Sequence, residues 1–212
     1  MKARIKRHLV ILSLTATILG ATIAAPTVGH ASIFGFFDDT VLNIKSDTKG
    51  LPLTISTYDN GGQKIDQIKT KSAKIHTDSA MSKTDSNGNE KSSVIDIDYG
   101  KQRITHVGST MIAYEGLKNY QDEYAQKHNI TDQNKSVPLL NAMHQDFSNQ
   151  WNSQKRVVVI RSQAGNPIAT FAGNNVSIHN TEMKNTTKFV IDGHRLIVYR
   201  ADYTVYPTAS LK

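Results

Sequence analysis

The last third of the chain, residues 155–206, limits most strongly what this sequence can fold into. Short runs of Val, Ile, Phe and Tyr alternate there with Gly, Asn and Pro, and Asp192-Gly193 separates Phe189–Ile191 from Leu196–Tyr199. Runs of four to eight such residues between turn-forming residues are typical of antiparallel strands, and Asp-Gly between them favours a tight hairpin. We therefore predict a β unit over residues 155–212.

An earlier region has the same character. Its strand-like segments cover residues 41–45, 53–58, 73–76, 94–99, 103–106 and 110–114. Asn60-Gly61 lies between two apolar runs and predicts a type I′ hairpin, because both central residues of that turn need a positive φ. Residues 77–92 are polar, with almost nothing to bury, and we expect a flexible loop. Residues 41–114 are therefore predicted to form a first β unit.

Residues 115–154 change from strand to helix periodicity. A first helical face lies within residues 117–128, and Ser136-Val-Pro138 is a plausible start for a second helix. The apolar residues that share a face are Leu117, Tyr120 and Tyr124 in the first helix and Leu140, Met143, Phe147 and Trp151 in the second. We predict a two-helix connector that covers an open sheet face, with Met143 and Trp151 in the core rather than stacked on a ligand.

The two β units look related. Five residues of the first unit recur 103 positions later: Gly62, Ile65, Ile68, Ile75 and His76 correspond to Gly165, Ile168, Phe171, Ile178 and His179. Residues 92–98 match residues 186–192 at a spacing of 94, and Arg103-Ile104 corresponds to Arg195-Leu196. The predicted fold is β-rich α+β, with an internal repeat of two antiparallel β units joined by the helices. The alternative is that any two hairpin meanders look this similar.

The N-terminus has the pattern of a signal peptide. Four basic residues precede an apolar segment, Leu9–Leu19, and Gly29 and Ala31 place small residues before a cleavage site after Ala31. We predict a cleaved signal over residues 1–31 and a short lead-in over residues 32–40. The alternative, an uncleaved anchor, is disfavoured because a membrane span needs about 20 apolar residues.

Charge and cysteine content then limit the partners. The leader holds four of the 25 Lys and Arg residues and none of the 18 Asp and Glu residues, so cleavage lowers the net charge from +7 to +3. So small a charge gives little reason to expect nucleic acid as a partner. The chain has no cysteine, which excludes disulfides and a lipid-modified cysteine. We expect a secreted, extracellular protein, released or held noncovalently at the surface, with no stable membrane span after cleavage.

Several motifs resemble domain-of-unknown-function family 5052. They are Tyr58-Asp-Asn-Gly, Thr105-His-Val-Gly-Ser-Thr-Met-Ile, Arg156-Val-Val-Val-Ile-Arg-Ser-Gln-Ala-Gly-Asn-Pro-Ile and Thr186-Thr-Lys-Phe-Val-Ile-Asp-Gly-His-Arg-Leu-Ile-Val-Tyr. The resemblance covers most of the chain after the leader. It implies a small exported protein of a Gram-positive bacterium, many relatives being lipoprotein-like, whereas this chain lacks the cysteine. The family has no established catalytic residues, so none are carried over.

Two acidic groups could carry chemistry. Asp85-Ser-Asn-Gly-Asn-Glu90 partly resembles a calcium loop, with Asp96 as a distal ligand, but its Gly is at the fourth position rather than the sixth. Asp96, Asp98 and Asp192 could serve a hydrolase if the two units brought the carboxylates together, as retaining glycosidases require. Asp98 and Asp192 stand at turn positions, however, where Asp is favoured for its own backbone hydrogen bonds.

Histidine and serine give weaker signals. Six histidines follow the predicted cleavage site, without the short spacing of a zinc motif: His76, His106, His128, His144, His179 and His194. Val107-Gly-Ser109 lacks the second Gly of a nucleophile elbow. We therefore assign no catalytic, cofactor-binding or metal-binding residue.

The leading hypothesis is a noncatalytic secreted protein, a binding or structural component of the cell envelope. Its partner would be a cell-wall polymer or another exported protein. Two alternatives remain open: a secreted hydrolase with carboxylates between the β units, and a secreted partner or inhibitor of another exported protein.

Overall fold

The computed structural model describes residues 41–45, 52–78, 80–81, 86, 94–130, 140–181 and 183–211, with only the backbone at 41–45 and 141. The chain divides into two compact units, residues 1–35 and 36–212, and every described residue belongs to the second. The predicted signal peptide, the lead-in, most of the loop at 77–92 and the predicted helix start at 136–138 lie outside the described residues.

The described residues form thirteen strands, two α-helices and one 3₁₀ helix. In chain order these are β1 (Val41–Lys45), β2 (Leu53–Tyr58), β3 (Lys64–Thr70), β4 (Ser72–Thr77), β5 (Ile95–Tyr99), β6 (Gln102–His106), β7 (Thr110–Glu115), α1 (Tyr120–Lys127), α2 (Leu140–Trp151), β8 (Arg156–Arg161), β9 (Pro167–Gly173), β10 (Val176–Asn180), β11 (Thr186–Ile191), β12 (His194–Tyr199), β13 (Asp202–Pro207) and η1 (Thr208–Ser210). The predicted strands and both helices are confirmed. The last strand, β13, was not singled out from the sequence.

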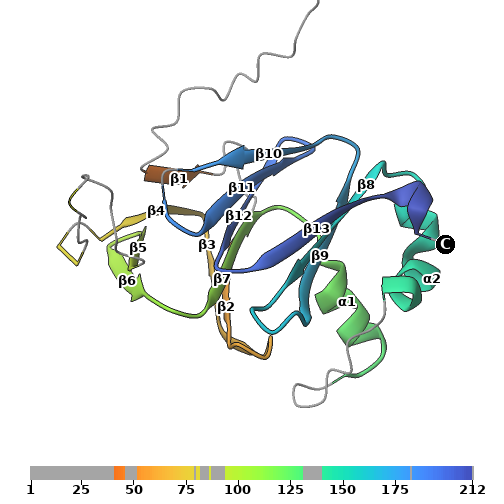
Figure 1. Ribbon diagram of the computed structural model, residues 1–212, viewed down its shortest axis with the longest axis horizontal. Helices are drawn as coiled ribbons and strands as arrows, with labels where there is room; N and C mark the ends of the chain where they lie inside the picture. Colours follow the sequence, from red (N-terminus) through yellow and green to blue (C-terminus); the bar gives the residue numbers. More distant parts are fainter. Residues whose placement is uncertain are drawn as a thin grey trace, which may run out of the picture. The chain divides into compact units, whose positions relative to one another are not determined.

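All strand pairs are antiparallel, and they form three sheets (Figure 1). A four-stranded sheet has the order β1-β4-β5-β6, a six-stranded sheet the order β10-β11-β12-β7-β2-β3, and a three-stranded sheet the order β13-β8-β9. The β-rich α+β class is therefore confirmed.

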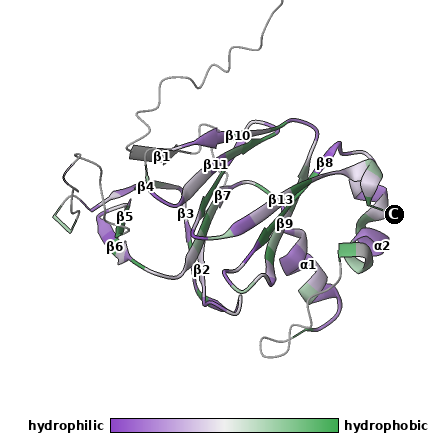
Figure 2. Ribbon diagram, viewed as in Figure 1, coloured by the Kyte–Doolittle hydropathy of each residue, from purple (hydrophilic) through white to green (hydrophobic). Residues whose placement is uncertain are grey.

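The sheets and helices stack in four layers, with the six-stranded sheet between the other two sheets and the helices outermost (Figure 1). In β7, Met111 and Ala113 face the four-stranded sheet, while Ile112 and Tyr114 face the three-stranded sheet. A strand covered on both faces needs apolar residues at successive positions rather than at alternate ones. β7 meets this need, and Figure 2 shows the hydrophobic residues concentrated on strands within the stack.

The helices cover the outer face of the three-stranded sheet. Met143 and Trp151 of α2 are fully buried and pack with Val157 and Val159 of β8. The Trp151 ring meets that of Tyr120 in α1 edge-on, with ring centroids 5.4 Å apart. The predicted core role of Met143 and Trp151 is confirmed, because both side chains lie in the apolar cluster formed with β8.

One strand pair joins the two predicted β units within a single sheet. β12, from the second unit, pairs with β7, from the first, over Leu196–Tyr199 and Met111–Tyr114. At one end of this pair Arg195 Nε donates to Glu115 Oε2 at 3.1 Å, with both side chains buried. We call β7, β12 and this ion pair the seam. Sequence patterns did not predict it, because its strands are about 80 positions apart.

Two turns test the hairpin predictions. At the β11–β12 turn, Asp192 and Gly193 have φ values of 49° and 87°, as a type I′ turn requires. The β2–β3 hairpin exists, but the type I′ turn at Asn60-Gly61 was wrong. In that loop Gly62 alone has a positive φ, 89°, because Asp59 Oδ1 accepts a hydrogen bond from Gln63 N at 2.7 Å and widens the turn to five residues.

Candidate functional site

A polar hollow of about 800 Å³ lies where α1 meets β2, β3 and β7. Its lining is rich in hydrogen-bonding side chains: Thr54, Lys64, Gln67, Lys69, Tyr114, Asn119, Asp122, Glu123, Gln126 and Asn129, with Leu117, Ala125 and Ile130. The volume is within the usual range for small-molecule sites, but the lining is more polar than is usual for them. We call this cavity the α1 hollow.

Asn119 places the wall of the hollow. It is the N-cap of α1, and its Oδ1 accepts hydrogen bonds from Gln121 N at 3.1 Å and from Thr170 N in β9 at 3.0 Å. Its Nδ2 donates to Asp122 Oδ2 at 2.9 Å. An Asn at the N-cap and an acidic residue in the first turn are both favoured at a helix start. The same amide therefore begins α1 and binds it to the edge of β9.

A salt bridge closes the opposite wall. Lys64 Nζ on β3 lies 2.9 Å from Asp122 Oδ1, and both side chains are partly exposed. The Lys64 ammonium also lies 6.0 Å from the centre of the Tyr58 ring. A partly exposed pair of this kind contributes about 1 kcal/mol or less. Its main effect is to fix α1 relative to β3.

Two buried tyrosines lie close to Asp122. Burial, with the charge of Asp122 as a second cause, raises the pKa of Tyr58 far above its ordinary value and the pKa of Tyr114 to about 12. The Tyr114 hydroxyl, which lies beside Thr54 and Asn119, is therefore protonated at neutral pH. Tyr114 lines the hollow as a neutral hydrogen-bonding group and not as a base or nucleophile.

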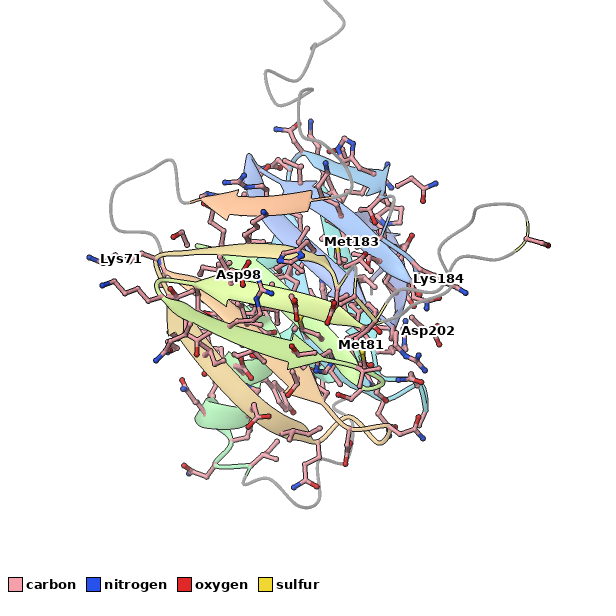
Figure 3. All side chains as sticks on the ribbon, turned by 90° about the vertical axis from the view of Figure 1, so that its left-hand side faces the viewer. Lys71, Met81, Asp98, Met183, Lys184 and Asp202 are labelled. Atoms are coloured by element: carbon pink, nitrogen blue, oxygen red, sulfur yellow. The ribbon has the colours of Figure 1, made fainter. Side chains whose placement is uncertain are left out.

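A second polar cluster lies on the four-stranded sheet around Asp98, which Figure 3 labels. Asp98 binds Arg103 Nε at 2.6 Å and His76 Nε2 at 2.9 Å. The neighbouring carboxylate, Asp96, accepts from Thr105 Oγ1 at 2.7 Å and lies 3.1 Å from Arg103. We call these five residues the Asp98 network.

The electrostatics of this network differ from those of a general acid. Hydrogen bonds from Arg103 and then from His76 lower the pKa of Asp98 to about 2. A glycosidase acid needs a raised pKa instead. The Asp96 carboxylate is almost fully buried, with Thr105 and Arg103 as its partners.

Asp192 belongs to a different part of the fold. It lies in the β11–β12 turn, where its carboxylate accepts the backbone N–H groups of Asn174 and Asn175 at 2.7–3.1 Å. The three carboxylates considered for a hydrolase thus form two separate hydrogen-bonded groups, on different sheets. The Asp192 carboxylate accepts backbone N–H groups, the role for which Asp is favoured at turns, but these groups belong to a neighbouring turn and not to its own.

The histidines are dispersed over several elements. His106 Nε2 lies 2.9 Å from Ser109 O, His179 Nε2 lies 2.9 Å from Ser177 Oγ, and His128 pairs with Asp146 of α2. Ser109 lies in the turn between β6 and β7. Within the described part of the chain, no three His, Asp or Glu side chains are placed to hold a metal ion. The calcium hypothesis for Asp85–Glu90 falls outside the described residues, apart from Ser86.

Sequence reasoning missed the α1 hollow. An Asn followed by Asp122 and Glu123 at the start of α1 is a readable helix-start signal, and it could have drawn attention to Asn119. The contact between Lys64 and Asp122 joins residues 58 positions apart. No local pattern indicates such a pair, because it depends on how α1 docks against β3.

Comparison with known proteins gave one match. The family model described as "Domain of unknown function (DUF5052)" matches residues 13–211. No curated protein and no solved structure matches the chain significantly. No helix in the described ranges has the length and apolar character needed to cross a membrane. Because the family model spans nearly the whole chain, this protein belongs to the DUF5052 family.

Proposed function

We propose that this chain is a noncatalytic, exported binding module of the Gram-positive cell envelope, built from a duplicated β unit, with the α1 hollow as its binding site. The observation that carries the binding role is the hollow itself, about 800 Å³ with ten polar side chains in its lining. A hydroxyl-rich cell-wall polymer would match such a lining, because amides, Tyr hydroxyls and Lys ammonium groups bind hydroxyl and phosphate oxygens.

The charges of the hollow favour binding over catalysis. Asp122 is already bound by Lys64 and Asn119, and the Tyr114 hydroxyl stays protonated well into the alkaline range because its pKa is raised to about 12. A nucleophile or general base would need the opposite tuning, with a free partner and a pKa near neutrality. Lys69, Gln126 and Asn129 add further donors and acceptors around the cavity.

Strand register in the two hairpins supports the duplication. Leu53 lies opposite Thr70 in the β2–β3 pair, and the residues 103 positions later, Arg156 and Gly173, lie opposite each other in the β8–β9 pair. Each hairpin also shifts register at the same point, after Thr57 in the first and after Ile160, again 103 positions later, in the second. Two unrelated meanders would have no reason to share both features.

The later strands also support the duplication, at a spacing of 92 positions instead of 94. Ile75 lies opposite Ile97, whereas Ile178 lies opposite Phe189, so the first member of the pair moves by 103 positions and the second by 92. The spacing of 92 also relates Arg103 to Arg195. Gly108 and Arg200, 92 positions apart, both have positive φ, at 90° and 50°. Under the proposed duplication, residues 186–192 therefore correspond to residues 94–100 and not to residues 92–98.

Retention on purified envelope polymers tests the proposal. We expect the protein to bind peptidoglycan or teichoic acid at low salt, and we expect Lys69→Ala combined with Gln126→Ala to abolish most of that retention. Lys71→Ala is the matched control, since it removes a nearby exposed lysine that does not line the hollow. Absence of retention by the unaltered protein would remove the envelope role. Equal retention of the Lys69→Ala, Gln126→Ala variant and the control would show that the α1 hollow is not the binding site.

The export proposal has its own test. The leader pattern supports cleavage after Ala31, so protein recovered from the medium or washed from the cell surface should begin at Ser32. N-terminal sequencing would give this result directly. Material that keeps residues 1–31 would contradict cleavage, whichever ligand the hollow binds.

A further inference from the structure

The seam shows how strands of the two β units recognise each other. Over four consecutive residue pairs, Leu196–Tyr199 of β12 face Met111–Tyr114 of β7. Tyr199 and Met111, which face each other, are both 0% exposed. Apolar pairs directly opposite each other are the main unit of stabilisation between antiparallel strands. The seam is thus a specific, apolar strand-to-strand contact.

The duplication assigns an equivalent to each seam strand. At the spacing of 92, β6 corresponds to β12 and β13 corresponds to β7. Within the described residues these equivalents do not pair with each other: β6 is an edge of the four-stranded sheet and β13 an edge of the three-stranded sheet. An edge strand presents unpaired N–H and C=O groups that can accept another strand.

The two edges of the three-stranded sheet, β9 and β13, have different surroundings. On β9, Thr170 N donates to Asn119 Oδ1, so that α1 covers this edge. β13, at the opposite edge, has β8 as its one strand neighbour among the described residues. Within the described residues, one edge of this small sheet is therefore covered by a helix, while the other simply ends the sheet.

Exposed apolar side chains mark the same positions as in the seam. Val107 is the equivalent of Tyr199, and Tyr203 is the equivalent of Met111, each 92 positions apart. Val107 is 59% exposed and Tyr203 is 37% exposed, and both rank among the exposed large hydrophobic residues of the described chain. The two residues of this pair are thus buried within the seam, whereas their two equivalents are exposed elsewhere on the surface.

We propose that β6 of one copy pairs with β13 of a second copy, in the register of the seam. Val107 of one copy then lies opposite Tyr203 of the next, and Ile104 lies opposite Tyr206. This inference rests on the duplication proposed above and not on the binding role of the α1 hollow. The partner is another copy of this chain because both halves of the contact are present on every copy.

The contact is heterologous, since it joins two different edges. Each copy in a pair keeps one free β6 and one free β13, so the assembly grows head to tail and does not stop at a symmetric dimer. Growth of this kind fits an envelope protein that forms arrays. It also makes the proposal testable with complementary variants.

Sedimentation of the purified protein over a wide concentration range gives the first test. We expect the average mass of the unaltered protein to rise continuously with concentration. Val107→Lys and Tyr203→Lys should each remain monomeric alone, because each blocks one edge, and their mixture should form a dimer through the two intact edges. Ile65→Lys is the control, since Ile65 is 54% exposed on the edge strand β3 and should leave the association unchanged.

Cysteine cross-linking gives a second test that does not depend on the lysine variants folding. The chain has no cysteine, so the only thiols are the introduced ones. Directly opposed residues of antiparallel strands have Cα atoms about 4.5–5.5 Å apart, within reach of a disulfide. Val107→Cys mixed with Tyr203→Cys should form a heterodimer on oxidation, faster than either forms a homodimer and faster than Ile65→Cys with Tyr203→Cys.

Three results would overturn the proposal. They are an unaltered protein that stays monomeric throughout, a mixture of lysine variants that forms no dimer, and cross-linking no faster than in the control pair. Polymer retention measured on the same samples separates this inference from the proposed function. If the protein stays monomeric and still binds polymer, only the strand pairing is disproved. If it assembles and binds no polymer, only the binding role of the α1 hollow is disproved.

Discussion

Arg103 and Arg195 occupy equivalent places in the two proposed β units but have different surroundings. The Arg103 side chain is 56% exposed and binds Asp98 and Asp96 on the neighbouring strand of its own sheet. Arg195 is buried and binds Glu115 across the seam at 3.1 Å. β6 ends its sheet, whereas β12 is continued by β7. The pairing of the whole strand, and not the local sequence alone, therefore decides what each arginine contributes.

Removing the seam carboxylate should give the largest effect. Glu115→Ala leaves the Arg195 guanidinium buried without this counter-charge, and we expect a loss of about 3–5 kcal/mol in the free energy of unfolding. Urea unfolding would measure it. The double variant Glu115→Leu, Arg195→Leu should recover most of the loss, since no charge is then buried.

The matched change in the first unit is Arg103→Ala, which should destabilise far less because the side chain is mostly solvated. A loss from Glu115→Ala no greater than that from Arg103→Ala would remove the distinction between the two arginines.

Alkaline unfolding sharpens the contrast between buried Tyr114 in the α1 hollow and the partly exposed Asp98 network. A group whose pKa is raised in the folded state stabilises the fold below its unfolded pKa and loses that contribution as the pH rises. For Tyr114 the window runs from pH 10 to about 12. The unaltered protein should lose on the order of 2 kcal/mol relative to Tyr114→Phe across it. Parallel curves for the two proteins would contradict the assigned environment.

Gly173 allows the two β units to be compared at a backbone position. A Cβ at Gly173 would lie 2.5 Å from Ile191 Cγ2 and 2.9 Å from Asp192 Oδ2, so Gly173→Ala should destabilise by about 1–3 kcal/mol. The equivalent residue in the first unit is Thr70, 103 positions earlier, where a side chain is already present. Thr70→Ala should therefore be nearly neutral in thermal unfolding. Equal losses at both positions would argue against the crowding at Gly173.

Acid unfolding should show the smallest effect. Asp98 has a lowered pKa, so it stabilises the fold above its unfolded value of 3.8 and loses that contribution as the pH falls to about 2. Asp98→Asn should therefore be slightly less stable than the unaltered protein near neutral pH and equal to it near pH 2. A difference that persists at the lowest pH would mean that Asp98 acts through packing instead of charge.

Local patterns were sufficient for every strand except β13, for the two helices and for the core role of Trp151. Val and Ile runs, turn residues and helical spacing act over a few positions, where sequence is informative. The continuous apolar run Leu196–Tyr199 could have indicated a strand buried on both faces. Which strand it pairs with could not be read, because β7 lies about 80 positions earlier. The α1 hollow could not be predicted from the sequence for the same reason, since Lys64 and Asp122 meet only after α1 docks against β3.

Hydrogen exchange at single backbone amides would test the seam most directly. In dilute solution, where copies stay apart, we predict that amides of Leu196–Tyr199 and Met111–Tyr114 are among the slowest to exchange, while alternate amides of β6 and β13 exchange quickly at their open edges. Amides of β12 that exchange as fast as those of β6 would contradict the account, because both strands would then be edges and the two units would not share a sheet.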